Sequence, residues 1–298
     1  MASITRFAPS PTGPLHLGHA YAAIVAHDLA RAEGGRFLLR IEDIDQTRCK
    51  PEWEQAIYDD LHWLGLDWDD TPMRQSTRLP VYKAALDQLW SRDLLYPCSC
   101  TRRDIDAALG APQEAATPGP DGPIYPRTCA DRHCRGLPCS MSPRPNDQHL
   151  RLDIGQAAMA CDHSVLRPGG GDWGLWFQET GPAHNGAIFC RRDAYSRDIG
   201  DVVLARKDFG TSYHLSVVLD DAAQRVTQVT RGDDLFAATP VHVLLQRLLN
   251  LPTPSYHHHR LIRDDQGNRL AKRDNARALS KYRAEGATPQ DIRRLVSL

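Results

Sequence analysis

The pattern of apolar and polar positions along this chain predicts strands that alternate with helices. Residues 4–7 predict a short β-strand, and the prolines and glycine that follow exclude regular structure until a helix at about residues 18–32. Further apolar, β-branched stretches predict buried strands at 39–41, 217–219 and 226–230. This alternation is typical of an α/β fold in which helices cover both faces of a mostly parallel sheet.

Polar side chains follow several of these predicted strands directly. Glu42 and Asp43 come after the first of the apolar strands, Asp220 and Asp221 after the next, and Arg231 after the last. Ligands of open α/β sheets bind at this edge. Arg231 suits bidentate recognition of a carboxylate, and Glu42 suits an ammonium group, although a solvated acidic loop is the alternative for the carboxylates.

Two histidines stand where the first helix is predicted to begin. His16 and His19 flank Gly18, and the exposed N–H groups and positive dipole end of a helix N-terminus favour phosphate binding. Imidazoles at this place can donate hydrogen bonds to a triphosphate. The alternative is that they only cap the helix or lie in solvent. Lys272, far along the chain in a basic loop, is the second candidate for phosphate contact, with a solvated surface as its alternative.

Composition and charge restrict the class of protein. The chain has 298 residues, of which 41% are hydrophobic and 24% charged, so a disordered or fibrous protein is excluded. A net charge of −1 gives no overall attraction to nucleic acid, and RNA contact would depend on local patches. The sequence has neither a signal peptide nor an apolar run of about 18 residues, so we expect a cytoplasmic protein without membrane contact.

The cysteines are clustered. Five of the eight fall between residues 98 and 139, in a segment rich in Pro and Gly that gains order from a structural metal such as Zn²⁺. These five are Cys98, Cys100, Cys129, Cys134 and Cys139. By ligand chemistry alone, Cys134 or His133 is the better fourth partner for the first three. Cys49, Cys161 and Cys190 are scattered, which is typical of buried, small apolar residues.

Four blocks of sequence together resemble one enzyme family. They are RFAPSPTG at 6–13 with HLGH at 16–19, LRIEDIDQTR at 39–48, YHLSVVLDD at 213–221 and RGDDL at 231–235. In this order they resemble the glutamyl/glutaminyl branch of the class I aminoacyl-tRNA synthetases. The resemblance covers residues 4 to about 100 and 200 to about 280, and it implies a Rossmann-like catalytic domain that an α+β insertion interrupts.

The resemblance implies that L-glutamate is activated by ATP with Mg²⁺. It assigns glutamate binding to Arg6, Ala8, Ser10, Glu42, Tyr213 and Arg231, and ATP binding to His16, Gly18, His19, His258 and Lys272. His16, His19 and Lys272 would be the catalytic residues. Arg6 and Arg231 are candidates for either carboxylate of glutamate. The loop at 264–273 matches the family's lysine motif, but Arg269 and Ala271 replace its usual lysine and serine.

The same family carries a zinc-binding insertion after its first catalytic half. Its Cys-x-Cys and Tyr-x-x-x-Cys pattern assigns structural Zn²⁺ to Cys98, Cys100, Tyr125 and Cys129. We divide the chain into a first catalytic half at 1–96, an insertion at 97–200, a second catalytic half at 201–255, and the lysine loop with short C-terminal helices at 256–298. Within the insertion, Gly and Pro mark 110–123 as an extra loop. Arg127, Arg132, Arg135 and Arg144 can meet RNA phosphates, and a solvated basic surface is the alternative of equal weight.

The region after Lys272 is short, whereas complete glutamyl-tRNA synthetases continue with an anticodon-binding domain. We therefore expect no such domain, and the chain resembles the shortened glutamyl-queuosine tRNA(Asp) synthetase subfamily. That subfamily attaches glutamate to queuosine, the modified wobble base of tRNA(Asp), so the implied partner is the anticodon stem-loop of this tRNA, bound by a monomer. The alternatives are a truncated synthetase that charges an acceptor end, an RNA-binding relative with a decayed site, and a nucleotidyltransferase acting on a small molecule.

Overall fold

The central β-sheet of the protein is parallel over most of its width. The computed structural model describes residues 2–109, 118–130, 138–161, 174–263 and 277–298. One part of the sheet has the strand order β1 (Ile4–Phe7), β2 (Arg36–Ile41), β3 (Met73–Arg74), all parallel. The other has the order β11 (Gln228–Gly232), β12 (Ser255–His259), β8 (Gly174–Glu179), β9 (Gly186–Arg191), in which only the β8–β9 pair is antiparallel.

The two parts of this sheet meet at β1 and β11. The Thr227 N–H donates to the Ile4 carbonyl at 2.9 Å, and the Ile4 N–H donates to Thr227 Oγ1 at 2.8 Å. The backbone before β2 also packs closely on the residue before β1, since a Cβ atom on Gly35 would lie 1.9 Å from the Ser3 carbonyl oxygen. Strands β1 and β11, more than 200 residues apart in the sequence, are therefore neighbours in the middle of the sheet.

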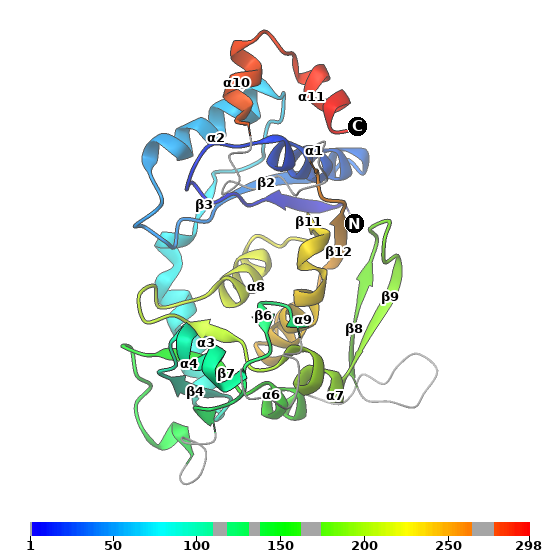
Figure 1. The fold of residues 1–298 in the computed structure, drawn as a ribbon. Helices are drawn as coiled ribbons and strands as arrows, with labels where there is room; N and C mark the ends of the chain where they lie inside the picture. Colours follow the sequence, from blue (N-terminus) through cyan, green and yellow to red (C-terminus); the bar gives the residue numbers. More distant parts are fainter. Residues whose placement is uncertain (1, 110–117, 131–137, 162–173, 264–276) are drawn as a thin grey trace.

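Helices cover both sides of the sheet (Figure 1). Helix α1 (Leu17–Ala32) packs its alanine-rich buried face on β1, β2 and β11, while α8 (Tyr213–Ala223) lies on the other side. The remaining helices are α2 (Pro51–Trp63), α3 (Leu79–Trp90), α4 (Arg102–Leu109), α6 (Ile154–Ala160), α7 (Arg192–Ala194), α9 (Thr239–Leu248), α10 (Leu279–Ala284) and α11 (Pro289–Leu295). Over the described ranges, no helix combines the length and apolarity that crossing a membrane requires.

A second, smaller group of strands lies at the far end of the molecule from α10 and α11 (Figure 1). It contains the antiparallel sheet β10 (Val203–Ala205), β7 (His149–Leu152), β4 (Leu95–Cys98) and the hairpin β5 (Pro118–Gly119), β6 (Gly122–Pro123). Strands β8 and β9 also fall within the segment 97–200 that we assigned to the insertion, yet they pair with β12 of the central sheet. The division into domains stays a prediction.

The structure confirms several of the elements expected from the sequence and corrects one. Strand β1, helix α1 and strand β11 lie at or within two residues of their predicted positions, and β2 ends where predicted but begins three residues earlier. Helices α10 and α11 are the expected short C-terminal helices. The strand predicted at 217–219 is wrong, because these residues belong to α8. Helix α8 is buried on most of its circumference, so its apolar residues are consecutive and do not recur every three to four positions. Such a run cannot be distinguished from a buried strand by its sequence pattern.

One buried carboxyl group of the fold makes stability depend on pH. Asp60 of α2 is 2% exposed, and its ion pair with Arg283 of α10 is long, at 3.9 Å. Burial raises its pKa to about 6, although Arg283 opposes the shift. The folded protein therefore binds the Asp60 proton more tightly than the unfolded chain does, and this contribution to stability is lost as the pH rises from about 4 through about 6.

Replacing Asp60 by asparagine removes that cost of ionisation. We expect Asp60→Asn to raise the free energy of unfolding at pH 7.5 by up to about 3 kcal/mol, and to change it little below pH 4. Urea unfolding at the two pH values measures the effect, with Asp59→Asn, an exposed neighbour, as the control. A loss of stability that is equal at both pH values would contradict this account of Asp60.

Candidate active site

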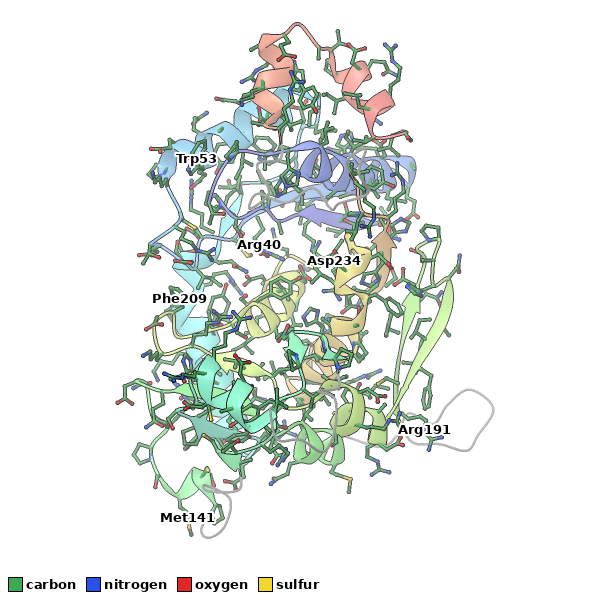
Figure 2. The ribbon with its side chains drawn as sticks, in the orientation of Figure 1. Arg40, Trp53, Met141, Arg191, Phe209 and Asp234 are labelled. Carbon is green, nitrogen blue, oxygen red and sulfur yellow. The ribbon has the colours of Figure 1, made fainter. Side chains whose placement is uncertain are left out.

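A buried carboxylate joins two arginines at the edge of the central sheet. Arg6 of β1 donates from Nε to Asp221 Oδ1 at 2.9 Å, and Arg40 of β2 donates from Nη1 to the same oxygen at 2.6 Å. All three side chains are less than 10% exposed, and Arg40 lies between β2 and α8 in Figure 2. Burial alone would raise the pKa of Asp221, but the two arginines outweigh burial and lower it. Asp221 therefore ties α8 to both strands as a carboxylate.

Glu42 completes this charge cluster at the end of β2. Its carboxylate accepts a hydrogen bond from Arg40 Nη2 at 3.3 Å, and its side chain is 14% exposed. Its backbone N–H donates to the Pro9 carbonyl, which fixes the loop after β1 beside it. Burial raises the pKa of Glu42 above its ordinary value, while Arg40 and Arg6 act against the rise. Two cations and two anions thus balance each other, with Glu42 as the most exposed member.

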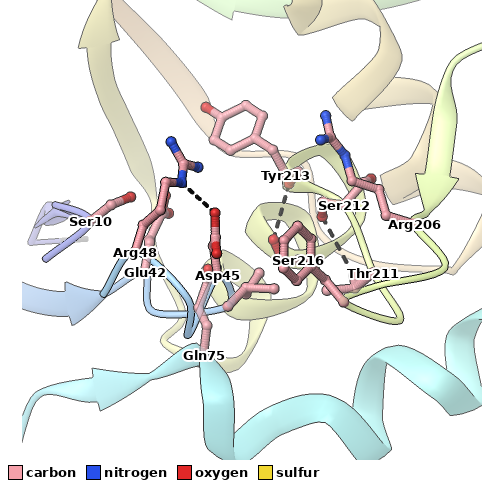
Figure 3. Close-up of a pocket in the computed structure, with 12 residues that line it drawn as sticks. Ser10, Glu42, Asp45, Arg48, Gln75, Arg206, Thr211, Ser212, Tyr213 and Ser216 are labelled. Carbon is pink, nitrogen blue, oxygen red and sulfur yellow. Dashed lines mark hydrogen bonds and ion pairs between the residues drawn. The ribbon is translucent and has the colours of Figure 1, made fainter. Parts of the chain in front are cut away.

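A cavity of about 220 Å³ opens in front of Glu42 (Figure 3). Its wall is formed by Ser10, Glu42, Ile44, Asp45, Arg48, Gln75, Arg206, Phe209, Thr211, Ser212, Tyr213 and Ser216. Three of the six predicted glutamate-binding residues, Ser10, Glu42 and Tyr213, therefore face one space. Arg6, Ala8 and Arg231 do not form part of this wall, and both arginines are buried.

Tyr213 stands at the start of α8 and connects the cavity with Arg231. Its side chain is 37% exposed, and its ring makes an edge contact with His242, with centroids 5.6 Å apart. Burial raises the pKa of the Tyr213 phenol, whereas the charge of Arg231 and a hydrogen bond with it lower that pKa. The pKa of the phenol therefore depends on the buried arginine behind it.

Arg231 of β11 is held by partners that the sequence did not identify. Its guanidinium donates to His258 Nε2 at 3.0 Å, to His242 Nδ1 at 2.8 Å and to Thr239 Oγ1 at 2.7 Å. The other ring nitrogen of His258, Nδ1, lies 2.5 Å from the fully buried carboxylate of Glu179. Burial would raise the pKa of Glu179, but its hydrogen bonds with His258 lower it. A buried anion therefore fixes the histidine that orients Arg231.

The two histidines of the first motif form the N-cap of α1. His16 Nδ1 accepts from the Gly18 N–H at 3.1 Å, and His19 Nδ1 accepts from the His16 N–H at 3.2 Å. A Cβ atom on Gly18 would lie 3.0 Å from the His16 ring, so a glycine lets the imidazole close over the helix end. Capping, one of our two interpretations, is thus observed, and it uses the Nδ1 atom of each ring.

The described residues that follow the lysine loop lie at the start of α1. Lys272, Arg269 and Ala271 lie outside the described residues. After the loop, Ala278 forms an antiparallel bridge with His16, and the Leu279 N–H donates to the Leu15 carbonyl at 2.8 Å. The chain therefore comes back to the start of α1 six residues after Lys272.

Three cysteines and one tyrosine converge at the end of β4. The thiols of Cys98, Cys100 and Cys129 all lie within 4.8 Å of one another, and Tyr125 Oη is 3.5 Å from Cys98 Sγ and 3.3 Å from Cys100 Sγ. Arg151 lies over the Tyr125 ring at 3.7 Å and donates to Cys98 Sγ, so one cation contacts two members of the cluster.

This arrangement fits a tetrahedral metal ion. Three cysteine sulfurs, which are typical zinc ligands, and one phenol oxygen, which is an uncommon one, provide four donor atoms close enough together to surround a single ion. The Cys129 N–H donates to Tyr125 Oη at 2.9 Å, which holds the phenol in place from behind. The alternatives His133 and Cys134 lie outside the part of the chain that the structure describes.

Two of the four arginines proposed to meet RNA phosphates are held by acids. Arg127 forms ion pairs with Asp153 and Asp201, and Arg144 forms one with Asp87. A phosphate would have to compete with these ion pairs, and RNA contact by the two side chains stays a prediction. Arg132 and Arg135 fall outside the described residues.

Comparison with known proteins gives a consistent result. Residues 3–130 and 184–298 match the sequence family described as tRNA synthetases class I (E and Q), catalytic domain. The chain is 62% identical over 295 residues to the glutamyl-Q tRNA(Asp) synthetase of Rhodobacter capsulatus, across 99% of this chain and 100% of that relative. It is 40% identical to the enzyme of the same name from Rhodopirellula baltica, across 98% of this chain and 83% of that relative.

Solved structures share the fold. A glutamate tRNA ligase from Elizabethkingia meningosepticum, in complex with its amino acid, superposes with a TM-score of 0.71 at 24% identity. The match covers 100% of this chain but 61% of that one, so the present chain spans less than two thirds of its length. A glutamate-tRNA synthetase from Elizabethkingia anophelis gives the same score and covers 62% of that chain.

The charge cluster around Asp221 predicts a large loss of stability when its central anion is neutralised. Asp221→Asn leaves Arg6 and Arg40 buried without their shared carboxylate, and we expect the free energy of unfolding to fall by about 3–5 kcal/mol. Urea unfolding measures this. Asp45→Asn, which breaks the more exposed pair with Arg48 at the cavity wall, is the control and should change stability little. Similar losses in both variants would contradict the central role of Asp221.

The thiol cluster predicts bound metal. We expect the purified protein to contain zinc in an amount close to one ion per chain, measured by mass spectrometry of the metal, and chelation to lower its melting temperature. Cys98→Ser and Cys129→Ser should lose the ion, whereas Cys190→Ser, on β9 and remote from the cluster in sequence, should keep it. Protein that is free of metal yet equally stable would rule out this site.

Proposed function

We propose that this chain, which belongs to the family of class I tRNA synthetases for glutamate and glutamine, activates L-glutamate with ATP and transfers it to queuosine at the wobble position of tRNA(Asp). The observation that carries the proposal is the high identity to the Rhodobacter capsulatus enzyme over the full length of that relative. The family membership confirms the resemblance inferred from the four sequence blocks, and it makes the chain a class I synthetase-like ligase.

The charges around the cavity suit a dicarboxylic amino acid. In our proposal the α-ammonium of glutamate binds Glu42, whose carboxylate is already polarised by Arg40. Arg6 and Arg231 receive the two carboxylates, since each uses three of its five N–H groups within the protein, and its Nη atoms can offer the others. Tyr213 completes the recognition from the start of α8. Ser10, in the loop after β1, lines the cavity, and we propose that Ala8 in the same loop also contacts the amino acid.

Activation takes place at the N-terminus of α1. The α-carboxylate oxygen of glutamate attacks the α-phosphorus of ATP, the bond from that phosphorus to the bridging oxygen breaks, and pyrophosphate leaves with the electron pair. We propose that His16, His19 and the helix N-terminus stabilise the phosphate charge, together with Lys272 and the Mg²⁺ that ATP brings. Gly18 lets the phosphates approach the helix end. No transfer RNA is needed for this step.

His258 takes a less direct part in the ATP site than its motif implies. Both of its ring nitrogens are already engaged, Nδ1 with Glu179 and Nε2 with Arg231. We therefore propose that it contacts adenosine through its backbone or ring carbons, and that its main task is to connect the nucleotide side of the site with Arg231.

The acceptor enters from the side of Tyr213. A second cavity of about 610 Å³ shares Arg206, Ser212 and Tyr213 with the first, and Arg102 and Arg151 also line it. We place the queuosine of the anticodon stem-loop there. A hydroxyl of its cyclopentene diol attacks the glutamyl carbonyl carbon, the hydroxyl proton is released, an ester forms and AMP leaves. We further propose that the chain acts as a monomer and that Zn²⁺ at Cys98, Cys100, Tyr125 and Cys129 orders the wall of this cavity.

The acceptor test uses tRNA(Asp) with and without queuosine. We expect labelled glutamate to join only the queuosine-bearing tRNA, and nuclease digestion to locate the label in the anticodon loop. Periodate cleavage of the diol, on tRNA whose terminal ribose is protected, should abolish the transfer. Labelling of both tRNA forms, or label on the terminal adenosine, would refute the proposal in favour of acceptor-end charging.

A further inference from the structure

A chain of hydrogen bonds runs from Arg231 to the protein surface. Beyond Arg231, His242 Nε2 lies 3.0 Å from His214 Nδ1, and His214 Nε2 lies 2.7 Å from Asp121 Oδ2. His214 and His242 are buried in α8 and α9, whereas the side chain of Asp121 is 59% exposed. The sequence motifs assign no task to His242 or Asp121.

The three hydrogen bonds that link Arg231 to Asp121 can all form at once only when both imidazole rings are neutral. A guanidinium donates and cannot accept, so His242 Nδ1 must be the acceptor from Arg231. The proton of a neutral His242 then sits on Nε2 and is donated to His214 Nδ1. His214 in turn carries its proton on Nε2 and donates it to Asp121. Burial lowers the pKa of His242 far below its ordinary value, as does the charge of Arg231, which keeps that ring neutral.

Asp121 lies in the turn of the β5–β6 hairpin and forms part of the wall of the larger cavity, beside Tyr213 and His214. Burial would raise its pKa, but the hydrogen bond with His214 outweighs burial and lowers it, so the group is a carboxylate at neutral pH. Arg231 therefore has an anion at the end of each of two paths, Glu179 through His258 and Asp121 through two histidines.

We infer that Asp121 is a positioning residue for glutamate binding, which acts through His214 and His242 to hold the Arg231 guanidinium in the orientation that receives a substrate carboxylate. Without the Asp121 carboxylate, His214 can carry its proton on Nδ1. His242 then has to accept at Nε2 and to present its own proton to Arg231, which breaks the hydrogen bond that orients the guanidinium. This inference rests on the proposed role of Arg231 in binding glutamate.

Three surface variants test the inference by glutamate-dependent ATP–pyrophosphate exchange. We expect Asp121→Ala to raise the KM for glutamate roughly fivefold, and to leave the KM for ATP and the melting temperature unchanged. Asp121→Asn should recover most of the affinity, because its amide oxygen still accepts from His214 Nε2. Asp106→Ala removes the same charge from an exposed residue that lines the same cavity, and it should have no effect.

Imidazole nitrogen chemical shifts provide the second readout. In the unaltered protein, His214 and His242 should both be neutral and protonated at Nε2, and Asp121→Ala should add the Nδ1-protonated form at His214. An unchanged KM for glutamate in Asp121→Ala, or a rise in both KM values together with a lower melting temperature, would overturn the inference. The absence of exchange in the unaltered chain would instead refute the proposed function.

Discussion

The buried carboxylate of Asp221, shared by Arg6 and Arg40, is the interaction on which the rest of the site depends. It joins α8 to two neighbouring strands, and it compensates two cations that could not otherwise be buried. Because Tyr213 begins the same helix, this ion cluster also sets the distance across which Tyr213 faces Glu42 (Figure 3). The charges that stabilise the fold here and the charges that would bind an amino acid belong to one network.

A second network fixes Arg231 in the same manner. Its guanidinium is oriented by His258, His242 and Thr239, and buried Glu179 orients His258. An arginine whose hydrogen-bond partners are held in place by other residues loses little side-chain entropy when it binds a carboxylate. If Arg6 of β1, Arg231 of β11 and Glu42 after β2 bind glutamate as we propose, the site is organised before its ligand arrives.

The residues at strand ends and in the motifs could be predicted from the sequence, because their spacing and chemistry are local properties. The N-cap formed by His16 and His19 around Gly18, and the clustering of the cysteines, belong to this class. Tyr125 does not, because only the family resemblance placed it with the cysteines, whereas ligand chemistry favoured Cys134 or His133. Glu179, His242 and Asp121 could not be predicted, since their partners come from elements far away in the chain. Likewise, no local sequence pattern predicts the ion pairs of Arg127 with Asp153 and Asp201.

In our proposal, Glu42 in the cavity wall and the fixed Arg6 and Arg231 buried outside that wall make the site specific for glutamate. Calorimetric titration of the unaltered chain with L-glutamate and with L-glutamine tests it most directly, because the two ligands differ only in whether the side chain carries a carboxylate. We expect glutamate to bind at least about tenfold more tightly than glutamine, since an arginine left without its carboxylate is penalised in a desolvated site. Equal affinities, or tighter binding of glutamine, would contradict the account.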